Sequence, residues 1–83
     1  MYDVIFTFRS MTAAQQGHYA CKRRNIPAPL IRTPYPLTEN GCGFAVQIPQ
    51  DALDQVLLIF KVERIEYERV YQKQGNRFQE VRV

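Results

Sequence analysis

The sequence is short of the residues that build metal sites. It contains two cysteines, Cys21 and Cys42, which form no C-x-x-C pair, and a single histidine, His18. A structural zinc ion needs about four such ligands. We therefore expect no metal site within one chain, and no pattern in the sequence calls for a cofactor.

Long apolar runs are also missing. The longest strongly apolar run covers only residues 56–60, whereas a helix that crosses a bilayer needs about 20 apolar residues. This pattern excludes a transmembrane helix and a membrane role. The N-terminus begins with a strand-like pattern and lacks a basic segment followed by an apolar core and a small-residue cleavage site. We therefore expect a cytoplasmic location.

Length and charge set further limits. A chain of 83 residues has room for one domain, residues 1–83, which buries about 60–65% of the surface that the unfolded chain exposes. Its hydrophobic content of 46% and charged content of 23% are ordinary for a globular protein. A net charge of +3 permits an anionic partner, but it is too small to indicate nucleic acid.

Hydrophobic periodicity predicts five strands and two helices. Alternation of apolar and polar residues indicates strands, and apolar spacings of three and four residues indicate helices. The strands are expected at 2–8, 28–32, 44–48, 66–72 and 78–83, and the helices at 10–24 and from 50 or 51 to 63 or 64. This order favours an α+β, ferredoxin-like βαββαβ sandwich, with an antiparallel sheet, both helices on one face and an added C-terminal hairpin strand.

The first predicted helix carries a stripe of small residues. Ala13, Ala14, Gly17, Ala20 and Cys21 recur at three- and four-residue spacings, which would let the helix approach the sheet closely. Cys21 belongs to this stripe, so we expect it to behave as a small hydrophobe. His18 lies at the edge of the stripe with no second base or ligand nearby in sequence, and is expected to have no chemical role.

Three cations, Lys22, Arg23 and Arg24, close the first predicted helix. Cations at this position complement the negative end of the helix dipole and satisfy its last carbonyls. Capping is therefore the expected role, with an anion or partner site as the alternative.

The stretch Asn40-Gly41-Cys42-Gly43 holds the candidate reactive atom. Gly41 and Gly43 leave the thiol of Cys42 uncrowded, and both could take positive φ. Backbone N–H groups around such a turn could form a small anion-binding concavity that stabilises a thiolate. The alternative is that the glycines only shape the entrance to a strand and that Cys42 is a small filler.

Three further residues are expected at the same end of the sheet. Arg32, Tyr35 and Arg9 are candidate contacts for an anion or a partner, although each could be an ordinary exposed residue. Two prolines, Pro34 and Pro36, stiffen the connection 33–39 and should hold Tyr35 extended, so that the loop presents Cys42.

These residues resemble a family of small bacterial proteins described as selenium/sulfur carrier-like. The likeness covers nearly the whole chain up to about Gln72: Ser10 and an alanine-rich helix, then Ile26-Pro27, Thr33-Pro34 and Cys42-Gly43. It implies a role in trafficking sulfur or selenium, with Cys42 as the carrier atom and with donor and acceptor proteins as partners. Cys21 and the tail 75–83 match no feature of the family.

Such a carrier needs an exposed thiolate and a face that docks donor and acceptor, but no catalytic base within the chain. The sequence therefore favours a carrier or binding protein over an enzyme with its own turnover. A different class of function is an assembly module without chemistry, such as a homodimer formed through the uncovered sheet face by Tyr67, Tyr71 and Ile5.

RNA binding is a third hypothesis, because the predicted strand order matches that of the RRM and residues 41–46 look like a degraded form of its third-strand signature. Cys42 replaces the aromatic residue expected there, and Asn40 replaces the basic one. Phe44, Val46 and Ile48 share one face of their strand and should point into the core. These differences weigh against nucleic acid.

Overall fold

The computed structural model describes residues 3–37 and 43–83. In chain order, the elements are β1 (Val4–Thr7), α1 (Met11–Lys22), β2 (Leu30–Arg32), the 3₁₀ helix η1 (Tyr35–Leu37), β3 (Phe44–Ile48), the 3₁₀ helix η2 (Gln50–Ala52), α2 (Leu53–Glu63), β4 (Arg69–Gln74) and β5 (Arg77–Glu80). Within these ranges, no helix has the length and apolar character needed to span a bilayer.

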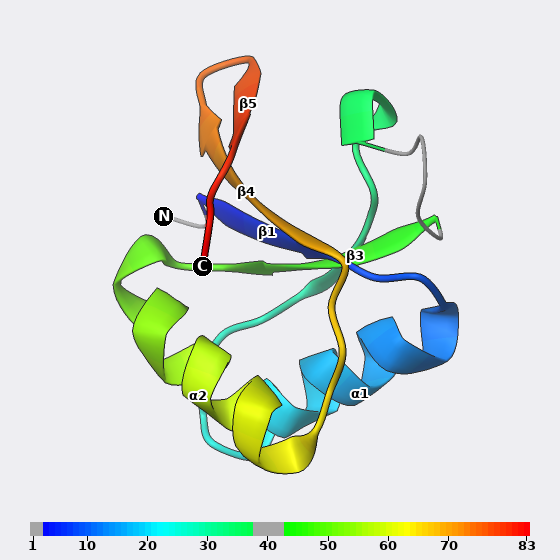
Figure 1. Cartoon of the computed structure of the whole chain (residues 1–83), viewed down its shortest axis with the longest axis vertical. Coiled ribbons are helices and arrows are strands. Elements are labelled where there is room, and N and C mark those ends of the chain that lie inside the picture. Colours follow the sequence, from blue (N-terminus) through cyan, green and yellow to red (C-terminus); the bar gives the residue numbers. More distant parts are fainter. Residues whose placement is uncertain (1–2, 38–42) are drawn as a thin grey trace.

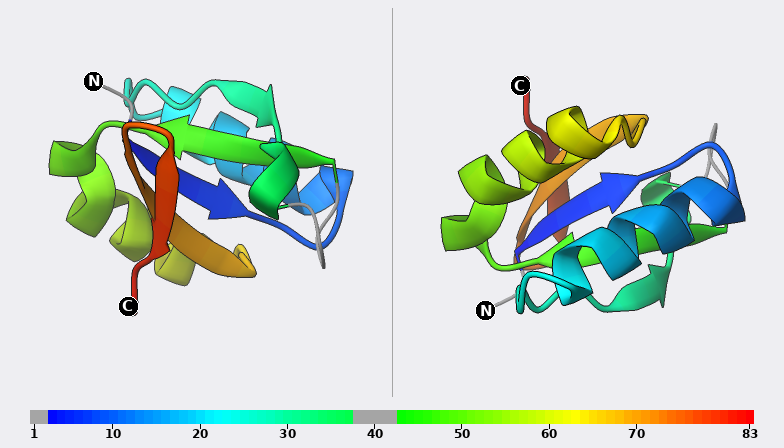
Figure 2. Two further views of the ribbon diagram at one scale, coloured as in Figure 1. Left: turned by 90° about the horizontal axis from the view of Figure 1, so that it is seen from above. Right: turned by 90° about the horizontal axis from the view of Figure 1, so that it is seen from below.

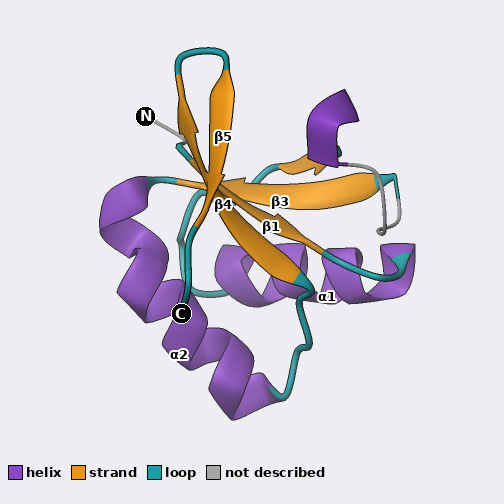
Figure 3. Cartoon of the chain, turned by 45° about the horizontal axis from the view of Figure 1, so that its top comes forward, coloured by secondary structure: helices purple, strands orange, loops and turns teal. Residues whose placement is uncertain are grey.

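The five strands form one sheet in the order β2-β3-β1-β4-β5, and every adjacent pair is antiparallel. Both helices lie on the same side of this sheet, while η1 and the β4–β5 hairpin rise on the opposite side (Figures 1 and 3). The protein is therefore a small α+β structure, consistent with the ferredoxin-like arrangement that the sequence predicts. The short strand β2 lies at a sheet edge. Prolines have no backbone N–H to donate to a neighbouring strand, and an edge position tolerates this loss.

The ends of α1 follow local capping rules. The Ser10 hydroxyl accepts a hydrogen bond from the Ala13 N–H at 3.1 Å, which satisfies one of the free amides of the first turn. At the other end, the Arg24 guanidinium donates to the Ala20 carbonyl at 3.2 Å, so the predicted capping role is confirmed for this arginine. Asn25 takes a left-handed φ of 59° and turns the chain away. The helix therefore ends two residues before the predicted boundary.

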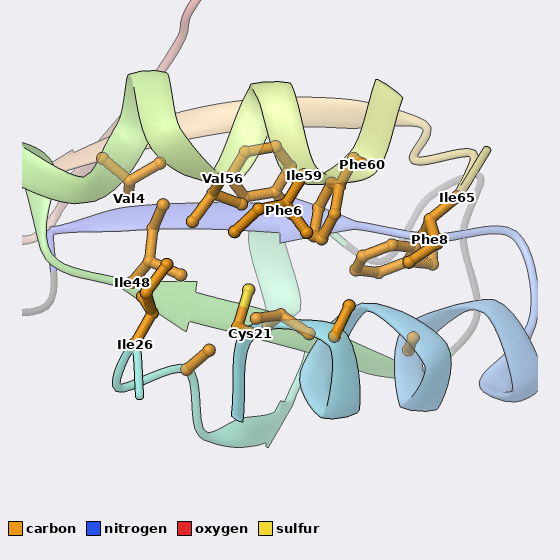
Figure 4. Packing of buried hydrophobic residues seen from close by; sticks show 14 of the residues in the cluster. Val4, Phe6, Phe8, Cys21, Ile26, Ile48, Val56, Ile59, Phe60 and Ile65 are labelled. Atoms are coloured by element: carbon orange, nitrogen blue, oxygen red, sulfur yellow. The ribbon is translucent and has the colours of Figure 1, made fainter. Parts of the chain in front are cut away.

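Aromatic rings form the centre of the core. The rings of Phe6 on β1 and of Phe8, just after β1, meet the ring of Phe60 on α2 edge-on, with centroid distances of 5.0 and 6.1 Å (Figure 4). Edge-to-face pairs of this kind stabilise beyond their buried area by about 0.5–1.5 kcal/mol. Val46 and Ile48 on β3 are fully buried beside them, as the sequence predicts.

Gly17 lets α1 approach this aromatic cluster. A Cβ placed on Gly17 would lie 3.0 Å from the Phe8 Cζ and 3.1 Å from the Phe60 Cζ, closer than most real Cβ contacts. Ala20 and Cys21, one turn further along, are completely buried. The predicted stripe of small residues is confirmed, and it fixes how near α1 lies to β1 and α2.

Two predictions about the uncovered sheet face are wrong. Ile5 alternates away from the helices as expected, yet only 1% of it is exposed, because it lies on the central strand between Gln47 and Tyr71. Tyr67 lies before β4, not within it, and its ring meets that of Phe6 at 5.1 Å. Tyr67 therefore packs on the helix side of the sheet.

The expectation of an extended Tyr35 is also wrong. Residues 35–37 form the 3₁₀ helix η1, closed by a hydrogen bond from the Leu37 N–H to the Pro34 carbonyl at 2.8 Å. The φ that a proline ring imposes is compatible with a 3₁₀ turn as well as with an extended chain. The rest of the predicted loop, residues 38–39, lies outside the described residues.

The substitution Gly17→Leu tests this packing. Four added heavy atoms would have to enter a space bounded by Phe8 and Phe60, so we expect a loss of about 1–3 kcal/mol in the free energy of unfolding. The matched control is Gln16→Leu, which places the same side chain at the neighbouring exposed position. Urea unfolding of both variants measures the effect; equal stabilities would contradict the close approach of α1.

Candidate functional site

Gly43 opens β3 at one end of the sheet. Its carbonyl accepts a hydrogen bond from the Thr33 N–H at 2.9 Å, which extends the β2–β3 ladder beyond the Arg32–Phe44 pair. Gly43 is exposed, and a Cβ placed on it would meet no atom of the described residues within 4 Å. The candidate residues Gly41 and Cys42 lie outside the described residues.

The backbone of Gly43 differs from the prediction. Its φ does not fall in the left-handed region that favours glycine, whereas Gly75 in the β4–β5 turn has a φ of 62°. The hydrogen bond from the Thr33 N–H already aligns Gly43 with β2. Positive φ is therefore not the reason for a glycine at position 43, and open space beside it is what the structure offers.

Arg32 contributes positive charge at this sheet end. It pairs with Phe44 across the β2–β3 ladder, and its guanidinium carbon lies 5.8 Å from the centroid of the Phe44 ring. A cation over an aromatic face is attracted by the ring quadrupole, so the Phe44 ring helps to hold the guanidinium beside the strand end. This contact fits the predicted role of Arg32 near an anion.

Arg9 and the start of α1 lie at the same sheet end. Thr7 pairs with Ala45 in the antiparallel β1–β3 ladder, so the chain that leaves β1 passes the beginning of β3. The side chain of Arg9 is 86% exposed, and its Nε lies 3.8 Å from Glu68 Oε2. Arg9, Arg32 and Gly43 therefore lie at the same end of the sheet, Arg9 on the side of Glu68 and Arg32 on the edge strand β2.

The N-terminus of α1 is a feature that the sequence analysis did not assign to this site. No acidic residue occupies its first turn, so the positive end of the helix dipole is not offset by a carboxylate of its own. Its location could have been inferred from chain order, because a strand and the helix that follows it must meet at the end where the strand stops.

Tyr35 projects on the other side of the sheet. It belongs to η1, three residues after the end of β2, and it is 90% exposed. Because η1 rises on the face without helices, Tyr35 and the start of α1 flank this end of the sheet from opposite sides (Figure 2). An exposed aromatic ring at such a position suits contact with a partner.

Cys21 has the opposite environment. Its side chain is completely buried among core residues, with the sulfur directed into the core (Figure 4). Burial raises the pKa of the Cys21 thiol to about 11; the positive charge of Arg24 works against this shift, and Glu63 adds to it. The thiol is therefore protonated near neutral pH, and the thiolate is the form that reacts.

His18 and the cations after α1 have structural partners. The Nδ1 atom of His18 lies 2.6 Å from the carbonyl oxygen of Ala28. Because a carbonyl only accepts, this nitrogen carries the proton, and the hydrogen bond links α1 to the segment before β2. At the end of α1, Arg23 and Arg24 both pair with Glu63, the last residue of α2. The hydrogen bond from Arg24 is the main cause that lowers the pKa of Glu63. These contacts join the C-terminal ends of the two helices.

The acidic and sulfur side chains show no metal centre in the part of the chain that is described. Within residues 3–37 and 43–83, no three His, Cys, Asp or Glu side chains are grouped closely enough to hold a metal ion.

Comparison with known proteins adds the decisive finding. A family model described as "Putative Se/S carrier protein-like" matches residues 3–72. The chain belongs to this family. The match includes Cys42 and both glycines beside it, and it ends before β5. No curated protein and no solved structure matches the chain significantly.

The structure also bears on the two other hypotheses. For assembly through the uncovered sheet face, Tyr67 packs into the core and Ile5 is buried, so neither supplies exposed apolar surface. Of the three residues predicted for this face, the half-buried Tyr71 remains. For RNA binding, the predicted burial is confirmed for Val46 and Ile48, and Phe44 is partly buried and packs against the core.

The buried thiol of Cys21 should leave a signature in the pH dependence of stability. Its pKa is about 11 in the folded chain against 9.0 without burial, so between these pH values the unfolded chain releases a proton that the folded chain keeps. The full stabilisation, about 2.7 kcal/mol for this pKa difference, is present below pH 9 and is lost as the pH rises through 11. By pH 11, about 2 kcal/mol of it has been lost.

We expect the free energy of unfolding of the parent, minus that of Cys21→Ala, to decrease by this amount between pH 8 and 11. Urea titrations at several pH values measure it, and the subtraction removes the contributions of tyrosines and lysines. Parallel curves for the two proteins would show that the Cys21 thiol is not shielded.

Proposed function

We propose that this protein holds a sulfur or selenium atom on the thiol of Cys42 and passes it from a donor protein to an acceptor protein. The proposal unites the family, whose description is that of a carrier, with the surroundings of Gly43, the residue bonded to Cys42.

The inert state of Cys21 is the observation that carries the proposal. The chain has two cysteines, and a carrier thiol must be accessible and at least partly ionised. Cys21 is completely buried and its pKa is about 11, so it meets neither condition. Cys42 is the remaining thiol, and it precedes an exposed glycine at a strand entrance.

The charges at this sheet end support an anionic sulfur. The guanidinium of Arg32 and the positive end of the α1 dipole lie there, and α1 begins without an acidic residue. Arg9 lies there too, but Glu68 offsets its charge at 3.8 Å. Positive charge and a helix N-terminus both lower the pKa of a nearby thiol. The described surroundings therefore favour the thiolate over the thiol.

The transfer is an exchange of one bond for another. The Cys42 thiolate attacks the outer chalcogen atom of a donor persulfide or selenosulfide, and a new bond from the Cys42 sulfur to that atom forms while the donor's bond breaks. The donor sulfur leaves with the electron pair as a thiolate, so no external oxidant or reductant is needed. Delivery to the acceptor thiolate repeats the same exchange in the other direction.

We also infer that residues 1–83 form one ferredoxin-like unit. The order β2-β3-β1-β4 and its antiparallel pairing support this topology, and β5 extends it at the β4 edge.

Alkylation separates the two thiols. At neutral pH and with limiting iodoacetamide, we expect Cys42 to be modified at least about tenfold faster than Cys21, because only an accessible thiolate reacts. Mass spectrometry of the digested protein assigns the label to each cysteine. Equal, slow modification of both cysteines would remove the basis for a carrier.

Chalcogen loading tests the carrier function itself. After incubation with a low-molecular-weight persulfide, the parent should gain one sulfur atom in mass, and Cys42→Ser should gain none. The matched control Cys21→Ala should load as the parent does. Stability of Cys42→Ser within about 1 kcal/mol of the parent is expected for a loop site. Loading on Cys21 would contradict the proposal.

The open space beside Gly43 gives a further prediction. Because a Cβ there meets no described atom and the backbone is not left-handed, Gly43→Val should keep the stability of the parent to within about 0.5 kcal/mol. It should nevertheless slow alkylation of Cys42 more than Tyr35→Ala does, since the new side chain stands directly beside the thiol. The pH dependence of the alkylation rate is the measurement. An unchanged rate and apparent pKa in Gly43→Val would mean that Gly43 only shapes the strand entrance.

A further inference from the structure

The outer surface of α2 carries two exposed apolar side chains. Leu58 is 61% exposed and Val62 is 66% exposed, and they lie one helical turn apart. In the described part of the chain, neither belongs to the core or to the apolar residues that pack against it. No other described element passes over this side of α2 in the view from below (Figure 2). We call the surface formed by Asp54, Leu58, Lys61 and Val62 the outer α2 face.

The folding of a single chain does not explain this apolar pair. Straight-chain residues suit exposed helix positions, whereas Val is disfavoured in a helix because its branched side chain loses rotamers against the preceding turn. Among the large apolar side chains that are exposed in residues 3–37 and 43–83, Leu58 and Val62 are the two that lie a single helical turn apart. The pair is therefore suited to packing against a second protein surface.

Two charges of opposite sign lie beside the apolar pair. Asp54 is in the first turn of α2 and Lys61 in the last, and neither forms an ion pair within the described residues. Because successive residues of an α-helix are about 100° apart, Asp54 and Lys61 lie about 40° and 60° to one side of Leu58. Val62 lies about 40° to the other side. Both charges suit the helix dipole, and together they give one side of the outer α2 face an acidic end and a basic end.

We propose that the outer α2 face binds a second copy of this chain, with the two α2 helices antiparallel and related by a twofold axis at Leu58. Such an axis exchanges the two ends of the helix and keeps its sides. Asp54 lies about 6 Å before Leu58 along the helix and Lys61 about 4.5 Å after it, so each Lys61 comes beside Asp54 of the other copy. Leu58 meets Leu58 of the other copy, and Val62 flanks this contact. A parallel pairing would instead place like charges together.

The size of the face sets the strength of the pairing. The helix α2 has 11 residues and is about 16 Å long, so two such helices bury less than the roughly 1,200 Å² of a standard stable interface. We therefore expect a reversible dimer with a Kd on the order of 100 µM. A second copy is the partner that the charges favour, because one face supplies both members of each ion pair. The start of β3 lies away from α2, so the sheet end that carries Gly43 would stay uncovered in each copy (Figure 1).

Sedimentation velocity of the full chain between about 20 µM and about 1 mM measures the association, with a reductant present to exclude disulfide-linked dimers. We expect the average mass to rise from that of the monomer toward that of the dimer, and the association to weaken as salt increases. Leu58→Lys should raise the Kd at least about tenfold, because it places two like charges at the twofold axis. Lysine is a good helix former and position 58 is exposed, so this variant should fold as the parent does. The matched control Met11→Lys, which replaces an exposed apolar residue at the start of α1, should change the Kd less than about twofold.

Charge reversal tests the antiparallel arrangement. Asp54→Lys and Lys61→Glu each place like charges across the dimer, so each variant alone should associate more weakly than the parent. Their equimolar mixture restores both ion pairs and should form a heterodimer at least about fivefold more tightly than either variant alone associates. A parent that stays monomeric at about 1 mM, a Leu58→Lys variant that associates as the parent does, or a mixture with no more dimer than its components would each overturn the proposal. No thiol enters the readout, so failure here leaves the carrier proposal intact.

Discussion

The contact of Gly17 with the rings of Phe8 and Phe60 is the constraint on which the rest of the structure depends. These atoms bring β1, α1 and α2 together at one point, and a Cβ on Gly17 would already lie only 3.0 Å from the Phe8 ring. A chain of this length buries little apolar surface, and its core is closely packed. One close approach therefore decides the position of a whole helix. The distance of α1 from the sheet then sets where its N-terminus and its outer face lie.

The placement of α1 decides the environment of Cys21 and the position of the helix N-terminus. Close packing removes Cys21 from water, and desolvation makes its ionised form unfavourable, so its pKa rises to about 11. The same helix begins at the sheet end where Arg9, Arg32 and Gly43 lie, and there its dipole favours anions. One helix therefore buries the Cys21 thiol and begins, with the positive end of its dipole, at the sheet end that carries Gly43. An unreactive Cys21 fits the proposed carrier function, because a second reactive thiol would compete for the cargo.

The sequence by itself determined the element order, the small-residue face of α1, the cap at Ser10, the burial of Val46 and Ile48, and the inert character of Cys21. Each of these depends on residues that are close in the chain and on a simple period. Only the tertiary structure decided that Ile5 is buried on the central strand, that Tyr67 turns into the core, that η1 is helical and that Gly43 is not left-handed. The physical reason is that burial, strand ends and backbone angles at loops depend on neighbours distant in sequence, which no local pattern specifies.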